Sequence, residues 1–131
     1  MALLRAREAV MSHFRPMLDA HGVNEQQWRV VRVLAEAGPL DASEVAERAN
    51  ILAPSLTRMI KAMAERGLIA TARDERDARR LMLTLAPEGE ALLRAALPEQ
   101  MRIYAEIEAR FGAERLAELI DLLGELGKLK S

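Results

Sequence analysis

Four arginines alternate with three acidic residues in the segment Arg73-Asp74-Glu75-Arg76-Asp77-Ala78-Arg79-Arg80. Guanidinium groups bind phosphate oxygens and, through two parallel hydrogen bonds, the edge of guanine. The acids nearly cancel the positive charge, so this segment is not a general attractor of anions. We expect Asp77 to hold a neighbouring guanidinium in a fixed pose and to leave Arg79 or Arg80 projecting at the tip of a turn. The alternative is a solvated turn with local ion pairs.

A predicted helix over Pro54–Arg66 carries a second group of polar side chains. Its inward stripe is Leu56, Met59, Ile60 and Met63, and Pro54 suits the first turn because its missing N–H needs no partner there. The other side carries hydroxyl, guanidinium and ammonium groups that can reach base edges or phosphates. The alternative is an ordinary solvated helix face. With the charged segment, the predicted DNA-binding residues are Ser55, Thr57, Arg58, Lys61, Arg73, Arg76, Asp77, Arg79 and Arg80.

The surrounding elements position these two groups. Asp41 and Glu44 have the spacing of a capping box that opens a helix over Asp41–Ala49, and strands at Leu68–Ala72 and Leu81–Leu85 flank the charged segment. Two helices followed by a basic hairpin are typical of a winged helix-turn-helix. In that fold one helix enters the major groove of DNA, and the hairpin contacts the backbone or the minor groove.

Long amphipathic helices lie on both sides of this region. The pattern predicts a first helix that ends at Gly22, a second from Asn24 to Gly38, a fifth from Pro87 to about Arg110 with a bend at Pro98, and a sixth after Gly112. Their apolar faces exceed what the middle of the chain can cover, so we expect a homodimer. The alternative is an intrachain helical bundle.

The predicted fold is therefore mainly α with a small β-hairpin wing, a winged helix-turn-helix plus a helical dimerisation region. We expect one domain over residues 1–131, with dimerisation helices at 1–22 and 98–131 and the winged-helix lobe at 24–97.

Composition excludes several classes of protein. The chain has 131 residues, a net charge of −1 and no cysteine, so positive charge for DNA binding must be local and thiolate metal sites are excluded. The absence of a long apolar run or a signal-peptide core predicts a cytoplasmic protein with no membrane partner. Neither a glycine-rich phosphate loop, a nucleophile elbow nor a metal triad is found. We therefore expect no enzymatic activity, no cofactor and no metal.

The chain resembles the MarR family of transcriptional regulators along essentially its whole length. Asp77-Ala78-Arg79-Arg80 is similar to the family's wing motif, and Leu56-Thr57-Arg58 with Glu65-Arg66-Gly67-Leu68-Ile69 is similar to its recognition helix and strand entry. Three further segments resemble the branch that regulates homoprotocatechuate (4-hydroxyphenylacetate) degradation operons: Ala6-Arg7-Glu8-Ala9, Phe14-Arg15-Pro16 and Glu25-Gln26-Gln27-Trp28-Arg29-Val30-Val31-Arg32. The resemblance implies a homodimeric repressor that binds a palindromic operator in double-stranded DNA and is released by a small phenolic or aromatic-acid effector.

Two positions depart from the family pattern. Ala53 stands where a serine often precedes the Pro-Ser pair of the recognition helix, and Ala86 stands where a threonine usually follows leucine before helix five. Each change removes a hydroxyl that caps a helix, at a cost of about 1 kcal/mol.

The resemblance also implies a pocket for an aromatic acid between the DNA-binding lobe and the dimer helices. We expect Arg15 to bind the carboxylate, Trp28 to form a wall, and His13 or His21 to lie near the hydroxyl groups. The alternatives are that Trp28 is core and that Arg15 pairs with a carboxylate at the dimer interface. The predicted cluster is Ser12, His13, Arg15, His21, Trp28, Arg29 and Arg32.

A different class of function remains open on the sequence alone. The winged helix could be a protein-interaction module without a DNA operator, using the acidic residues Glu106, Glu108, Glu114, Glu118 and Asp121.

Overall fold

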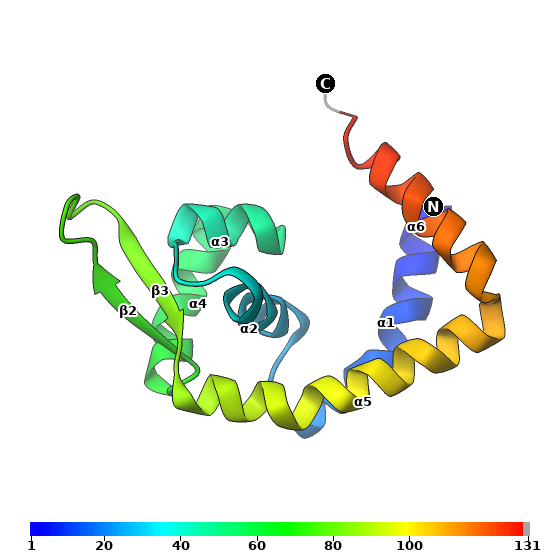
Figure 1. The fold of residues 1–131 in the computed structure, drawn as a ribbon, viewed down its shortest axis with the longest axis horizontal. Helices are drawn as coiled ribbons and strands as arrows, with labels where there is room; N and C mark the ends of the chain where they lie inside the picture. The colour runs from blue at the N-terminus through cyan, green and yellow to red at the C-terminus, as the bar shows by residue number, and fades with distance from the viewer. Residues whose placement is uncertain (130–131) are drawn as a thin grey trace.

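The computed structural model describes residues 1–129 as a head and an arm (Figure 1). The head contains α2 (Glu25–Ala37), β1 (Leu40–Asp41), α3 (Ala42–Ala49), α4 (Ala53–Glu65), β2 (Ile69–Arg73) and β3 (Leu81–Leu85). The arm is formed by α1 (Ala2–Ala20), the second half of α5 (Pro87–Phe111) and α6 (Ala113–Leu126). The predicted class, mainly α with a small hairpin wing, is confirmed.

The sheet has one strand more than the sequence predicts. Its order is β1-β3-β2 with both pairs antiparallel, and Leu83 lies opposite Leu40 on one side and Thr71 on the other. β1 is only two residues long, which is too short to show an alternating pattern. β2 and β3 with their connecting turn, residues 69–85, form the wing.

Local sequence signals set the helix starts. Asn24 with Gln27, and Asp41 with Glu44, form the predicted capping boxes of α2 and α3, since each side chain bonds the other residue's backbone N–H. α4 begins one residue earlier than expected, at Ala53, with Pro54 in its first turn. Ala86 precedes α5 as its N-cap and supplies no hydroxyl, as the sequence indicates.

The core lies where the head meets the first half of α5. Val30, Val31, Val45, Met63 and Leu83 are completely buried. Gly89 of α5 allows the helix to approach the sheet closely, because a Cβ atom there would lie 2.2 Å from the Leu68 carbonyl oxygen. The head is thereby fixed to the start of α5.

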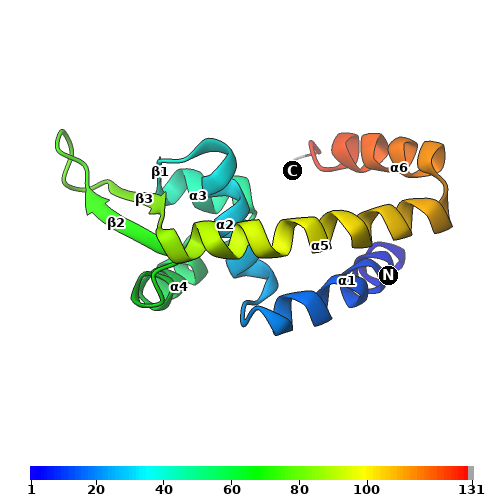
Figure 2. The ribbon, with the colours of Figure 1, turned by 60° about the horizontal axis from the view of Figure 1, so that its bottom comes forward.

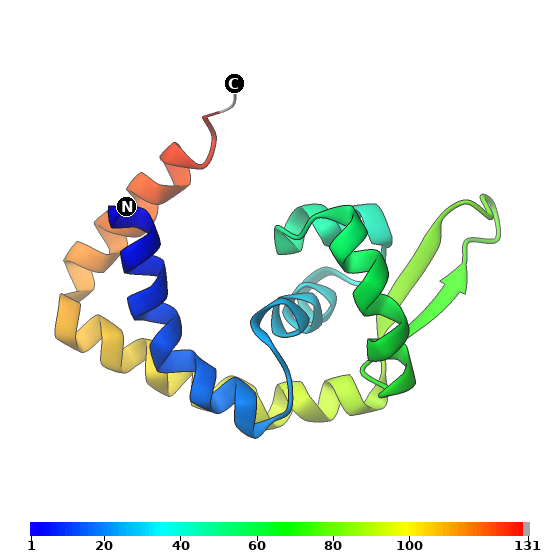
Figure 3. The same cartoon turned by 180° about the vertical axis from the view of Figure 1, so that it is seen from behind.

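The arm exposes much apolar surface. α5 runs through Pro98 as one helix and curves along its length (Figure 1). Figure 2 shows α6 turning back after α5, with α1 on the other side of α5, and Figure 3 shows α1 lying along α5 from behind. In α6, Leu119, Ile120, Leu122, Leu123 and Leu126 are between 38% and 54% exposed. A single chain therefore leaves the apolar face of this helix uncovered.

Across residues 1–129, we find no helix with both the length and the apolar character that a bilayer crossing requires.

Candidate nucleic-acid interface and adjoining cavity

α3 and α4 form a helix-turn-helix with a well-defined corner. α3 ends at Asn50, whose left-handed backbone (φ 54°) turns the chain. Ile51 and Leu56, the residues before the N-cap and in the first turn of α4, are both buried and have the positions of a hydrophobic staple. This arrangement fixes the angle at which α4 leaves the corner.

α4 carries four of the nine predicted DNA-binding residues. Thr57, Arg58 and Lys61 are exposed on its outward face, whereas Ser55 lies half-buried at the edge of this face. The Arg58 guanidinium donates a hydrogen bond to the Ser55 hydroxyl (3.3 Å), and the Thr57 hydroxyl donates to the Ala53 carbonyl (3.0 Å). Arg58 is thus held near the start of the helix, where recognition helices meet base edges.

Asp77 orients Arg79 at the outer end of the wing. Its Oδ1 accepts hydrogen bonds from the Arg79 backbone N–H (3.0 Å) and from Nε (3.1 Å), and these bonds lower the pKa of Asp77. The Arg79 side chain nevertheless remains 92% exposed. The prediction that Asp77 holds a neighbouring guanidinium is therefore confirmed, and the residue held is Arg79.

Arg80 points the other way and fastens the wing to α3. Its guanidinium donates to Asp41 (3.0 Å), to Asp74 (3.0 Å) and to Glu44 (3.4 Å). The backbone N–H of Glu44 and then Arg80 hold the pKa of Asp41 below its usual range, and Asp41 raises the pKa of Arg80. Of the two arginines expected at the tip, the structure places only Arg79 there. Contacts with DNA by all nine predicted residues stay predictions.

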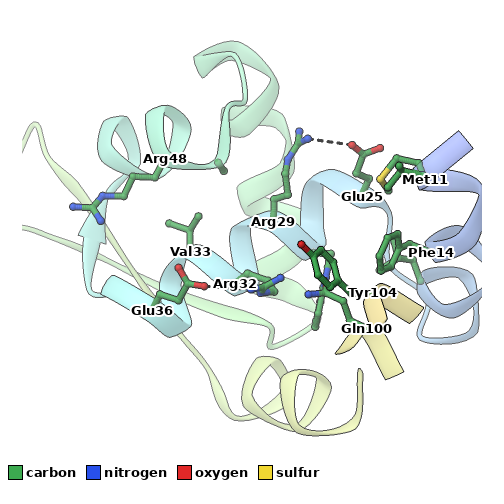
Figure 4. A pocket seen from close by; sticks show the side chains of 14 residues that line it. Met11, Phe14, Glu25, Arg29, Arg32, Val33, Glu36, Arg48, Gln100 and Tyr104 are labelled. Carbon is green, nitrogen blue, oxygen red and sulfur yellow. Dashed lines mark hydrogen bonds and ion pairs between the residues drawn. The ribbon is translucent and has the colours of Figure 1, made fainter. Parts of the chain in front are cut away.

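A cavity of ≈ 520 Å³ lies between the head and the arm (Figure 4). We call it the central cavity. α1 contributes Phe14, α2 contributes Trp28, Arg29 and Arg32, and α5 contributes Tyr104. The remaining lining residues are Val10, Met11, Leu18, Glu25, Val33, Glu36, Arg48, Ala49 and Gln100. Its size is within the range of small-molecule sites.

The polar groups of the central cavity include three guanidinium groups, and two of these pair with glutamates that also line it. Arg29 donates to Glu25 (3.1 Å), and Arg32 donates to Glu36 (3.4 Å). Within the described residues, Arg29 Nε is the buried side-chain atom that lacks a hydrogen-bond partner. The indole N–H of Trp28 donates to Gln100. Aromatic walls beside guanidinium groups suit a planar ring that carries a carboxylate.

The structure brings only part of the predicted ligand cluster to the central cavity, and ligand contacts by all of its members stay predictions. Of its members, Trp28, Arg29 and Arg32 line the central cavity, whereas Ser12, His13, Arg15 and His21 do not. Arg15 instead forms two hydrogen bonds with Glu8, one of them 2.9 Å long, and this pair lowers the pKa of Glu8. The two residues are seven apart on α1, so they lie two turns apart on one face of the helix.

The two histidines lie elsewhere. His13 borders a smaller hollow beside Ile107 and Phe111. His21 Nε2 lies 2.9 Å from a carboxylate oxygen of Glu99 on α5. Sequence reasoning missed Gln100 and Tyr104, because α5 reaches the cavity only through tertiary packing and the sequence shows no signal that joins them to α2.

Comparisons with known proteins identify the type of regulator. The model of the MarR family matches residues 21–80. The homoprotocatechuate degradative operon repressor of Escherichia coli is 45% identical over 124 residues, which are 95% of this chain and 84% of that protein. The chain belongs to the MarR family. The predicted family resemblance is thus confirmed, including the similarity to the homoprotocatechuate branch.

Solved structures of MarR-type regulators have the same fold. The crystal structure of NadR in complex with 4-hydroxyphenylacetate is 41% identical with a TM-score of 0.84, covering 98% of this chain and 92% of that one. The repressor CouR bound to a 23-mer DNA duplex is 25% identical with a TM-score of 0.89, covering 97% of this chain and 90% of that one. This MarR family member is accordingly a winged-helix DNA-binding transcriptional regulator.

Proposed function

We propose that this MarR family protein is a cytoplasmic, homodimeric repressor of an operon for aromatic-acid catabolism, the homoprotocatechuate (4-hydroxyphenylacetate) type. It binds a palindromic operator, and a small phenolic or aromatic carboxylate in the central cavity releases it. The position of that cavity carries the proposal. α1 and α5 of the arm line one side, and α2 and α3 of the head line the other. An occupant therefore contacts both parts whose relative position sets the spacing of two reading heads.

The lining chemistry supports an aromatic acid as the occupant. Arg32 and Arg29 supply donors for a carboxylate, and Arg29 Nε is already buried without a partner among the described residues. Phe14, Trp28 and Tyr104 supply flat apolar surface for a ring, and the Tyr104 hydroxyl can bond a phenol. The relative NadR was crystallised with 4-hydroxyphenylacetate, a molecule with both groups.

Dimerisation is supported by the arm. The exposed apolar side chains of α6, together with Leu3, Leu4 and Val10 of α1, form surface that a second copy would remove from water. A two-fold dimer also places two heads against the two halves of a palindrome, about 34 Å apart along B-form DNA.

The proposal is tested by measuring operator affinity with and without 4-hydroxyphenylacetate. Fluorescence anisotropy on the promoter DNA beside the protein's own gene should show tight binding that the acid weakens. Arg32→Gln should bind the same DNA and respond to the acid only at much higher concentration. Arg15→Gln, outside the central cavity, is the matched control and should respond like the wild-type protein. If no aromatic acid changes the affinity for the operator, the proposed effector class is wrong. If the protein does not bind this promoter DNA, the proposed repressor function is wrong.

A further inference from the structure

A large apolar side chain stands exposed at the start of the recognition helix. Leu52, the N-cap residue of α4, is 77% exposed. Ala53 and Pro54, which follow it, are exposed as well. Sequence reasoning assigned DNA contacts only to the polar residues that come later, so this apolar start of α4 has no assigned role.

The packing of the head does not account for Leu52. Its neighbour Ile51 is 6% exposed, and Ile51 with the buried Leu56 already occupies the two positions of a hydrophobic staple. Leu52 is also absent from the lining of the central cavity. Leucine is a poor N-cap residue, whereas serine or asparagine would bond the free N–H groups of the first turn. Neither core packing nor helix capping therefore favours leucine at this position.

Leu52 stands where a helix-turn-helix faces DNA. In a helix-turn-helix the first residues of the second helix reach the base edges in the major groove. Arg58, an exposed arginine, lies one turn after Pro54 on the outward face of α4. The apolar group that a base pair presents in the major groove is the 5-methyl group of thymine. Leu52 has the apolar surface that fits it.

We propose that Leu52 determines operator specificity by packing against a thymine methyl group in each half-site. This inference rests on the proposed function, because it requires that α4 enters the major groove. Burying one methyl group between Leu52 and DNA strengthens binding about fourfold, or roughly 0.8 kcal/mol, for each half-site. Through the same packing, the protein distinguishes thymine from cytosine at this operator position, because cytosine lacks the methyl group.

Uridine scanning tests the proposal, because deoxyuridine differs from thymidine only by that methyl group. An operator is first selected from a random duplex library with the wild-type protein. Each thymine is then replaced in turn, in both half-sites. We expect one symmetric position at which the affinity of the wild-type protein falls about fourfold per half-site. Leu52→Met, which keeps an apolar side chain, should show the same decrease.

Leu52→Ser should bind the uridine and thymine operators equally. Serine is a good N-cap, so this variant should melt at or above the wild-type temperature, which excludes misfolding as the reason for the missing discrimination. If no thymine position responds, or if Leu52→Ser responds like the wild-type protein, Leu52 does not read the methyl group. If the library yields no enriched sequence, the proposed function fails, and this inference fails with it.

Discussion

At the scale of single residues, Arg58, Arg79 and Arg80 divide into two groups. Arg79 keeps 92% of its side chain exposed although Asp77 holds it, and Arg58 lies on the outward face of α4 with Ser55 as its partner. Arg80 is engaged by three carboxylates. Residues in the first group can bind DNA without disturbing the head, so their substitution should change DNA affinity and leave stability intact.

Substitution of Arg79 should weaken binding to every operator to a similar degree. Arg79→Ala removes an exposed positive group at the tip of the wing. The slope of log affinity against log salt should therefore fall by about 0.9 for each phosphate that Arg79 neutralises, twice in a dimer. Titrations at several salt concentrations measure this slope. An unchanged slope would mean that Arg79 binds no phosphate.

Substitution of Arg58 should act differently. Arg58→Ala should relax base preference at one position of each half-site, at a cost of about 1–3 kcal/mol for the preferred base. Affinities for operators with all four bases at each position measure it. A uniform decrease across all four bases would instead place Arg58 on the phosphate backbone.

The ion pair of Asp77 should make the wing sensitive to acid. Because bonding by Arg79 lowers the folded-state pKa of Asp77, its stabilisation is complete above the usual value of 3.8 and is lost as the pH falls through the lower folded value. The backbone N–H resonance of Arg79, followed by NMR, should therefore titrate below pH 3.8. In Asp77→Asn this titration should vanish, and a midpoint at or above 3.8 would contradict the orientation role.

At the scale of elements, a single side chain matters at two places. One is the attachment of the wing to α3, and the other is the N-cap of α5. Arg80 joins the wing to Asp41 and Glu44, the two residues of the α3 capping box. Ala86 begins α5 without a capping hydroxyl. The attachment of the wing should matter for DNA binding and the cap for stability.

Release of the wing from α3 should increase the mobility of the turn at residues 74–80. Arg80→Gln removes the charge that the three carboxylates hold, so hydrogen exchange of residues 74–80 should accelerate while α4 stays protected. Glu75→Gln, in the same turn but outside these ion pairs, is the control. Equal exchange in both variants would show that Arg80 does not fasten the wing.

A hydroxyl at position 86 should stabilise the fold. Ala86→Ser supplies the missing cap of α5 at a residue with extended backbone (φ −98°, ψ 170°), so the free energy of unfolding should rise by about 1 kcal/mol. Urea denaturation at constant slope measures the change. A decrease would mean that the buried site cannot accept the oxygen.

The sequence predicted elements well where the signal was local and poorly where it was tertiary. Capping residues such as Asn24 and Asp41 located helix starts to within a residue, because a cap acts on its own first turn. Strand β1 and the positions of Gln100 and Tyr104 depend on partners far along the chain, and no local pattern encodes them. The sequence did not predict that Arg15 bonds Glu8 and lies outside the central cavity, because helix phase gives a face but not the neighbour that covers it.

At the scale of the whole molecule, the proposed mechanism needs both the exposed face of α6 and the central cavity. In the proposed dimer the arm would join two copies, and the cavity lies between the helices of the arm and those of the head. We expect the head to adopt two positions relative to the arm, one that fits the operator and one that does not. A ligand can lower operator affinity only if it binds the second position more tightly than the first. Coupling therefore requires both an intact dimer and an occupied cavity.

Disruption of the arm should abolish tight operator binding without damaging the head. Leu123→Glu places a charge in the apolar face of α6, so light scattering should show a monomer. Without the second half-site, operator binding should weaken by about a hundredfold to ten thousandfold. Glu118→Gln on the same helix is the control. A monomer with wild-type affinity would show that one head suffices.

Sedimentation of the wild-type protein with fluorescent operator, with and without 4-hydroxyphenylacetate, tests the coupling of cavity to DNA most directly. We expect two chains on each palindromic duplex, and separation of a still-dimeric protein from the DNA when the acid is added. One chain per duplex, or a complex that stays intact at saturating acid, would contradict a dimeric repressor released through the central cavity.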